Sequence, residues 1–207
     1  MIRSIQVDAG EINYNITWTG KVFDVPKIFT PNEAAALIEI SPKRIYKEIE
    51  HRIIHADTPN HNQLSFGTLV YLRALKEINF DFSVSYRIQL HEALQTAWAQ
   101  QVSTLEFGKF FTLKVGDIGQ ELQTLIDRFE AWKALLVSNP DILGGEIVFP
   151  NSRLSVQRIG GSLERGESLE ILREDYPYLT DEDFNFARIY VKAYPTQGRP
   201  KVDEVYN

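Results

Sequence analysis

Apolar residues recur along this chain with two periods, which predict a few strands and a larger number of helices. Within residues 1–29 the apolar side chains alternate with polar ones at Ile12, Tyr14, Ile16 and Trp18, and this period of two predicts one or two strands. From residue 30 onward, spacings of three and four dominate, as in amphipathic helices. The expected fold class is therefore mainly α (α+β).

Two helix starts follow one another within a dozen residues. Thr30 suits an N-cap, Pro31 the first helical position and Glu33 the capping-box partner. Ser41 and Pro42 repeat the cap and the first helical position. Two helices joined by so short a turn predict a helix-turn-helix unit.

The second helix, from Pro42 to about residue 52, is predicted to be apolar on one side and cationic on the other. The apolar side holds Ile45, Tyr46, Ile49 and Ile53, and the cationic side holds Lys43, Arg44, Lys47 and His51, with Glu48 and Glu50 at the margins. A helix that reads the major groove of DNA needs such a face. The alternative interpretation is an ordinary solvated helix face.

The segment after this helix predicts a wing. The apolar stretches 53–56 and 63–64 flank a turn-rich hexapeptide at 57–62, which suits a short hairpin. Ser65 then caps a helix that carries Leu69, Leu72 and Leu75, and the order helix, helix, hairpin, helix is that of a winged helix. Tyr46, Asn60 and Asn62 are weaker candidates for phosphate or minor-groove contacts.

Residues 81–138 are predicted to link this 30–80 domain to a second one. A helix is expected around residues 88–98, a hairpin over 105–115, and a long helix capped by Asp117. The long helix places Leu122, Leu125, Phe129, Trp132 and Leu136 at alternating spacings of three and four. This pattern fits packing inside one subunit or a dimerisation seam, and it does not separate the two.

Residues 139–195 predict a small domain with a strand at 147–149 and three short helices. Gly166 can end the first helix, Ser168 caps the second and Thr180 begins the third. Three short helices bury little surface, so dimerisation or docking is expected. The tail, 196–207, is predicted to be non-helical. It is either a frayed terminus or a segment that orders on a partner through Arg199 and Lys201.

Composition limits the classes of function. The chain of 207 residues has no cysteine, which excludes disulfides and thiolate metal sites. We find neither a signal-peptide pattern nor an apolar run of about 20 residues, so a cytoplasmic protein without membrane contact is expected. The net charge is −6, so any DNA contact must come from a local basic face.

No catalytic constellation stands out, and we expect neither an enzyme nor a cofactor. His51, His55 and His61 lie close together, but no carboxylate follows at a zinc-enzyme spacing. An acidic cluster near the C-terminus could suggest a Mg²⁺ site, yet helix caps and solvated faces explain most of it.

Two resemblances carry the functional expectation. Residues 164–200 read ERGESLEILREDYPYLTDEDFNFARIYVKAYPTQGRP and, with Gly144-Gly145-Glu146, resemble the small helical domain of unknown function 433, a VapB-type antitoxin domain. The 30–80 domain resembles MerR-like winged helices, with matches at Thr30-Pro31, Glu33-Ala34-Ala35, Ser41-Pro42 and 69–75.

The sequence departs from these families at two places. Glu39 stands where the winged helices have a turn glycine, so either it costs about 1 kcal/mol at positive φ or the turn differs. At 150–156 the sequence PNSRLSV replaces the usual RGTRIPV and loses its glycine and proline.

The resemblances imply the antitoxin of a type II toxin–antitoxin pair. Such a protein neutralises a PIN-like ribonuclease toxin by direct binding and represses its own operon as a homodimer on a palindromic operator. The alternative is a protein-interaction module or a transcription regulator without a toxin partner. A nuclease or metalloenzyme is the least favoured class.

Overall fold

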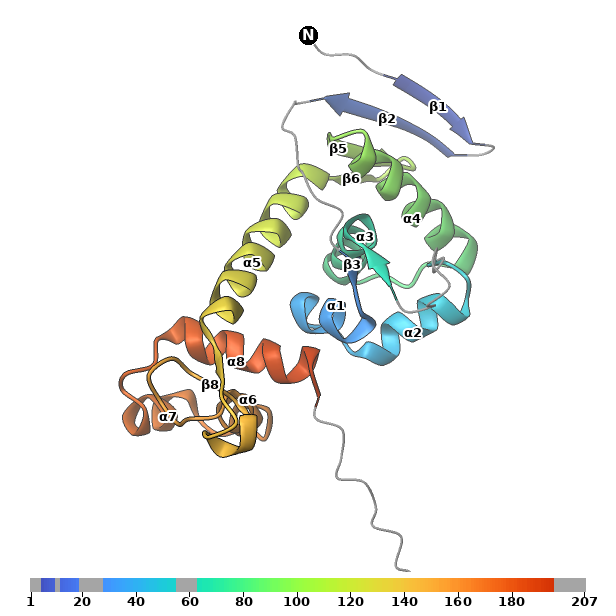
Figure 1. Ribbon diagram of the computed structural model, residues 1–207. Helices are drawn as coiled ribbons and strands as arrows, with labels where there is room; N and C mark the ends of the chain where they lie inside the picture. Colours follow the sequence, from blue (N-terminus) through green and yellow to red (C-terminus); the bar gives the residue numbers. More distant parts are fainter. Residues whose placement is uncertain (1–4, 10–11, 19–27, 55–62, 196–207) are drawn as a thin grey trace, which may run out of the picture. The chain divides into compact units, whose positions relative to one another are not determined.

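The chain divides into two compact units, and the boundary between them along the sequence falls inside one helix. The computed structural model describes residues 5–9, 12–18, 28–54 and 63–195, and it divides the chain into a first unit, 1–131, and a second unit, 132–207 (Figure 1). The described residues are mainly helical with small sheets, which confirms the expected fold class. The five-part division predicted from the sequence is finer than this split and stays a prediction.

The first unit combines helices with two antiparallel sheets. The strands are β1 (Ile5–Ala9), β2 (Ile12–Trp18), β3 (Ile28–Phe29), β4 (Leu64–Ser65), β5 (Val102–Phe107) and β6 (Phe111–Leu113). The helices are α1 (Pro31–Ile38), α2 (Pro42–Glu50), α3 (Phe66–Ile78), α4 (Val84–Ala99) and α5 (Val115–Leu135), whose last turn belongs to the second unit.

The N-terminal strands join the central hairpin in one sheet. Its order is β1-β2-β5-β6, with Ile16 opposite Leu105 and Leu105 opposite Leu113. The N-terminal strands and the hairpin predicted near 105–115 are therefore confirmed. The hairpin ends earlier than predicted because Val115 already begins α5, so Asp117 lies in the first turn and is not the cap. Its carboxylate still complements the positive end of the helix.

The predicted helix caps at Thr30, Ser41 and Ser65 are confirmed. Thr30 Oγ1 accepts a hydrogen bond from Glu33 N at 3.2 Å, and Thr30 N donates to Glu33 Oε2 at 2.8 Å. Ser41 Oγ accepts from Lys43 N at 3.2 Å, and Ser65 Oγ accepts from Thr68 N at 3.2 Å. Each cap supplies an acceptor for an amide that the first helical turn leaves unpaired.

The turn between α1 and α2 is strained at Glu39. This residue ends α1 with φ 58° and ψ 51°, in the left-handed region that favours glycine. The sequence left two alternatives, a strained Glu39 at positive φ or a different turn, and the structure shows the strained residue. Lys76 Nζ donates to Ile38 O at 2.8 Å and lies 3.4 Å from Glu39 Oε2, so α3 supports this helix end.

The hairpin predicted over 53–64 is wrong in the part that the structure describes. Strand β4 pairs with β3, with Ile28 opposite Ser65 and Phe29 opposite Leu64. Ile53 and Ile54 are buried, and their amides donate to Glu48 O at 2.9 and 3.3 Å. These apolar residues close the end of α2 and fill the core, so they are not in a strand. Residues 55–62 lie outside the described residues.

Helix α3 is the core of the first unit. Its residues Leu69, Val70, Tyr71 and Leu72 are almost completely buried. In Figure 1, α3 lies at the centre of this unit, with α1 and α2 on one side and α4 on the other. Residues 66–72, the first two turns of α3, are all buried and carry no charged side chain, whereas Arg73, Lys76 and Glu77 lie partly at the surface in the later turns.

The second unit has a two-stranded sheet and three helices after α5. The elements are β7 (Val137–Ser138), the 3-10 turn η1 (Leu143–Gly145), β8 (Ile147–Val148), α6 (Val156–Glu164), α7 (Leu169–Asp175) and α8 (Asp181–Ala193). The predicted strand, the three helices and the caps at Ser168 and Thr180 are confirmed. Gly166, at φ 88°, follows the end of α6 as expected.

Helices α6 and α8 pack closely because Gly160 has no side chain. A Cβ atom at Gly160 would lie 2.3 Å from the carbonyl oxygen of Ala187. Phe184 and Ala187 are buried, as predicted, whereas Val191 is half-buried and Phe186 is buried in addition. The glycine therefore serves the contact between the two helices.

Most of the apolar series predicted on the long helix is buried within the chain. Leu122, Phe129 and Trp132 are buried, while Leu125 and Leu136 are half-buried. The indole of Trp132 packs against Phe149 and Phe186 and donates to Asp183 Oδ1 at 2.8 Å. Packing within one chain accounts for the buried members, and the dimerisation seam stays a prediction.

Relieving the strain at Glu39 should stabilise the protein. Glu39→Gly removes the left-handed penalty of about 1 kcal/mol, and the exposed pair with Lys76 that it also loses is worth less than that. We expect the thermal midpoint, followed by circular dichroism, to rise by about 1–3 °C.

Glu50→Gly is the matched control, because Glu50 lies in the last turn of α2 in a helical conformation. The same substitution there should lower stability by about 0.5–1 kcal/mol. Equal losses for both variants would contradict the strain at Glu39.

Candidate functional site

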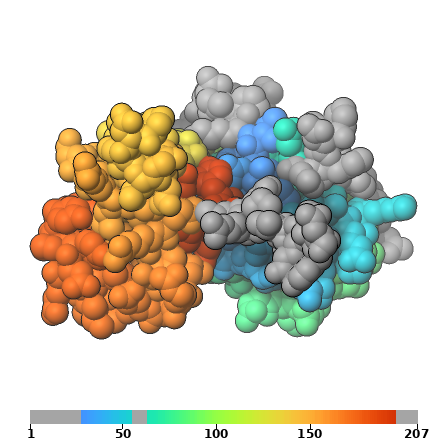
Figure 2. Space-filling model, turned by 60° about the horizontal axis from the view of Figure 1, so that its bottom comes forward, coloured from blue at the N-terminus to red at the C-terminus, as the bar shows by residue number. Residues whose placement is uncertain are grey.

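Helix α2 presents a cationic face to solvent. Lys43, Lys47 and His51 are exposed, and Ile45 is completely buried on the opposite side. Within the described part of the chain, the side chains of these three residues make no hydrogen bond or ion pair. The surface of α2 is visible in Figure 2, coloured light blue to cyan. The two ammonium groups and the imidazole are therefore available to an anionic partner.

Arg44 belongs to this face only in part. It is half-buried, and its Nη2 atom donates to the carbonyl oxygen of Leu75 at the end of α3 over 3.4 Å. A cation near the last carbonyls of a helix stabilises the negative end of the helix dipole. Arg44 thus has a structural contact as well as a place beside the cationic face.

The predicted orientation of α2 is wrong for two residues. Tyr46 is 47% exposed and lies on the outward side, whereas Glu48, which the sequence placed at the margin, is only 2% exposed. The buried positions are therefore 45 and 48, one turn apart. The prediction weighed side-chain hydrophobicity, but Glu48 is buried because distant residues satisfy its charge.

Two side chains hold the Glu48 carboxylate. Tyr71 Oη on α3 donates to Glu48 Oε2 at 2.8 Å, and Arg87 Nη1 on α4 donates to Glu48 Oε1. Arg87 itself is 18% exposed. A buried carboxylate is tolerated only when it is paired and hydrogen-bonded in this way. The network ties α2 to both α3 and α4.

The same network keeps Tyr71 in its neutral form. Burial and, next, the neighbouring Glu48 carboxylate raise the pKa of Tyr71 far above its ordinary value. The phenol therefore remains a hydrogen-bond donor to Glu48 throughout the physiological pH range.

A polar pocket of about 470 Å³ opens beside the cationic face of α2. It lies between α2, the connection from α3 to α4, and the first turn of α4. Its lining residues are Arg44, Lys47, Glu48, His51, Leu75, Asn79, Phe80, Asp81, Phe82 and Arg87. Glu48 is already engaged with Arg87 and Tyr71, so the pocket offers cationic and aromatic groups together with one exposed carboxylate, that of Asp81.

Several predicted site residues fall outside the described part of the chain. They are Asn60 and Asn62 of the DNA-binding set and Arg199 and Lys201 of the partner-binding set. His55 and His61 of the possible metal site do so as well. Among the residues that the structure describes, no cluster of three or more metal-ligating side chains occurs, and no helix is long and apolar enough to cross a membrane.

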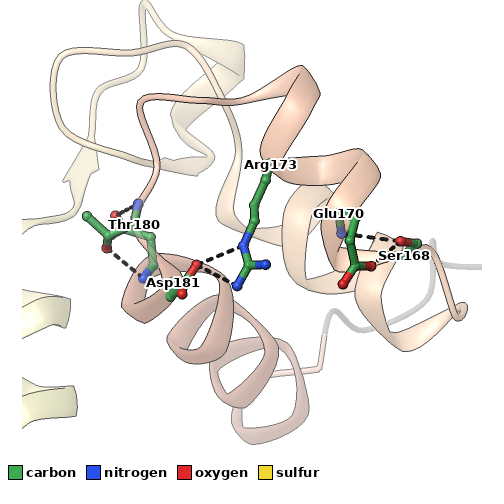
Figure 3. Close-up of polar contacts among 6 residues, drawn as sticks. Ser168, Glu170, Arg173, Thr180 and Asp181 are labelled. Carbon is green, nitrogen blue, oxygen red and sulfur yellow. Dashed lines mark hydrogen bonds and ion pairs between the residues drawn. The ribbon is translucent and has the colours of Figure 1, made fainter.

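The acidic residues of the second unit form caps and ion pairs. Arg173 lies 2.9 Å from Asp181, and Thr180 forms a capping box with Asp183 (Figure 3). Ser168 Oγ accepts from the amide of Glu170 at the start of α7. Helix caps thus account for part of the acidic cluster, as the sequence suggested.

Glu164 is held by two cations of α8. Arg188 lies 2.7 Å and Lys192 3.0 Å from Glu164 Oε1. Burial alone would raise the pKa of Glu164, but the hydrogen bonds from both cations outweigh it and lower this pKa below its ordinary value. This carboxylate therefore links α6 to α8 in its ionised form.

The second unit also exposes large apolar side chains. They lie on α5, the β7–β8 region, α7 and the loop before α8, and are Leu135, Val137, Leu143, Ile171 and Tyr178. Sequence reasoning did not single them out, because exposure of an apolar residue on a short helix depends on what packs against it.

Comparison with known proteins finds a family model that matches a segment of the chain. Residues 136–191 match the family described as protein of unknown function (DUF433). The uncharacterized protein y4eO of Sinorhizobium fredii is 32% identical over 94 residues, which span 45% of this chain and 42% of the relative. The crystal structure of Rv2018 from Mycobacterium tuberculosis aligns with this chain at 16% identity and a TM-score of 0.28. The alignment covers 80% of this chain and 98% of the Rv2018 chain.

Proposed function

We propose that this protein is the antitoxin of a type II toxin–antitoxin pair. In this proposal α1 and α2 form the helix-turn-helix of a MerR-like winged region that binds operator DNA, and the chain also binds and neutralises a PIN-like ribonuclease. The observation that carries the DNA-binding half is the exposed cationic face of α2, formed by Lys43, Lys47 and His51.

The arrangement of α2 suits a recognition helix. Ile45 and Glu48 anchor one side to the unit, and the opposite side turns Lys43 and Lys47 to solvent from the first two turns. Recognition helices contact DNA mainly through residues near their N-terminus, and lysines pair with phosphates there. Because the net charge of the chain is −6, affinity must come from this local face.

The antitoxin half has different support. Residues 136–191 match the DUF433 family, the domain that the second unit resembles in sequence, and the antitoxin role is our proposal from that sequence resemblance. The second unit also offers exposed apolar side chains such as Ile171 and Tyr178, which suit a protein partner. A homodimer would place two copies of α2 on a palindromic operator.

A second candidate is a protein-interaction module that does not bind DNA. The acidic net charge and the exposed apolar side chains of the second unit favour it. One measurement distinguishes the two candidates: the salt-dependent binding of the protein to upstream operator DNA.

Removing the two exposed lysines should flatten the salt dependence of DNA binding. With Lys43→Ala and Lys47→Ala together, each lost phosphate contact lowers the slope of log affinity against log salt by about 0.9. An electrophoretic shift assay with the upstream intergenic DNA over about 50–200 mM salt measures this slope. Arg44 is left in place because it also contacts Leu75.

The matched control is Lys109→Ala with Lys114→Ala. Both residues are exposed in the first unit but lie on the β5–β6 turn and just before α5. This pair makes the same change in net charge and should leave the slope nearly unchanged. Equal slopes for wild type and the Lys43/Lys47 variant, or no binding by wild type, would argue for the interaction module.

Charge reversal in the tail should weaken neutralisation of the toxin. If Arg199 and Lys201 offer cations to a carboxylate cluster of the nuclease, Arg199→Glu with Lys201→Glu should lower affinity about tenfold or more. If a neighbouring gene encodes a PIN-like ribonuclease, inhibition of that enzyme measures the effect, with Lys109→Glu and Lys114→Glu as the control. A neighbouring gene for an unrelated protein, or undiminished inhibition, would contradict this role of the tail.

A further inference from the structure

We propose that the pocket beside α2 binds a small phosphorylated ligand with a planar ring, of the nucleoside monophosphate class. Its walls combine cations, aromatic rings and one exposed carboxylate in a volume of about 470 Å³. Small-molecule sites in proteins are of this size, about 300–1,000 Å³. The binding itself is independent of the proposed antitoxin function.

The cationic wall suits the phosphate. Arg44, Lys47, His51 and Arg87 line one pocket, and guanidinium groups bind phosphate oxygens through paired N–H donors. Within the described residues, Arg87 uses Nη1 for Glu48, and its buried Nε atom has no hydrogen-bond partner. Part of the donor capacity of Arg87 is therefore unused.

The aromatic wall suits the ring. Phe80 lines the pocket and is 62% exposed, and its ring centroid lies 5.2 Å from that of Phe82. An exposed phenylalanine face is a platform on which a nucleobase can stack. Asp81, which is also exposed, can accept hydrogen bonds from ribose hydroxyl groups or an exocyclic amine.

The combination favours a free nucleotide over a backbone phosphate of duplex DNA. A backbone contact requires only cations, whereas Phe80, Phe82 and Asp81 supply ring stacking and a hydrogen-bond acceptor. Bases inside a duplex are stacked on one another, so their faces cannot reach Phe80. A ligand that contacts the cations, the aromatic rings and the Asp81 carboxylate of the pocket carries one phosphate, one unstacked base and a sugar.

The ligand would share two side chains with the cationic face of α2. Lys47 and His51 line the pocket and also belong to the exposed side of α2. If the proposed function holds, a bound nucleotide lowers the affinity for operator DNA, and this consequence alone rests on that proposal.

Calorimetric titration of the full chain tests the binding directly. The four ribonucleoside monophosphates, the corresponding nucleosides and inorganic phosphate are titrated separately at low salt. We expect at least one monophosphate to bind at least about tenfold more tightly than its nucleoside and than inorganic phosphate. No detectable binding of any monophosphate, or phosphate binding as tightly as all of them, would overturn the proposal.

Two single substitutions locate the site. Phe80→Ala and Lys47→Ala should each weaken nucleotide binding by about fivefold or more, since one removes the stacking face and the other a phosphate contact. Phe110→Ala and Lys109→Ala are the controls, because Phe110 is 90% exposed and neither residue lines the pocket. Equal affinities of the Phe80 and Phe110 variants would overturn the assignment.

A competition assay separates this inference from the proposed function. The preferred monophosphate is added to the complex of protein and operator DNA, and release of DNA is the expected result. Nucleotide binding without any DNA binding would refute the DNA-binding half of the proposed function and leave the pocket assignment intact. DNA that stays bound at saturating nucleotide would overturn only the shared use of Lys47 and His51.

Discussion

The buried carboxylate of Glu48 is the interaction on which the first unit depends. A charge on the inward side of α2 is costly unless it is paired, and Tyr71 from α3 and Arg87 from α4 supply the two donors. One residue of α2 thereby fixes its position against two other helices. Because Ile45 and Glu48 point inward, Lys43 and Lys47 must point outward.

The burial of Glu48 determines both surfaces on which the proposals rest, the cationic face of α2 and the pocket beside it. It turns the cationic face of α2 to solvent, and it holds Arg87 in the wall of the pocket beside that face. The turn before α2 adds a second constraint, since Glu39 accepts a left-handed conformation with Lys76 supporting the end of α1. The structure therefore maintains local strain and a buried charge around one short helix, features that often accompany functional sites.

Local features of the fold could be predicted from the sequence, and non-local ones could not. The caps at Thr30, Ser41 and Ser65 were correct because a cap involves only residues within one helical turn. Tyr46 and Glu48 were misplaced because Arg87, the partner of Glu48, lies 39 positions away in the chain. The pairing of β4 with β3 also joins residues that are far apart in the sequence, Phe29 and Leu64. The sequence pattern instead favoured a hairpin between neighbouring segments, which does not form.

The stability of a Glu48→Ala variant tests the central role of this carboxylate most directly. Removing it leaves Arg87 and Tyr71 without their acceptor, so urea unfolding should show a loss of about 3–5 kcal/mol. Glu50→Ala, at an exposed position in the same helix, should change stability by less than about 0.5 kcal/mol. Equal and small effects of the two substitutions would show that Glu48 does not anchor α2.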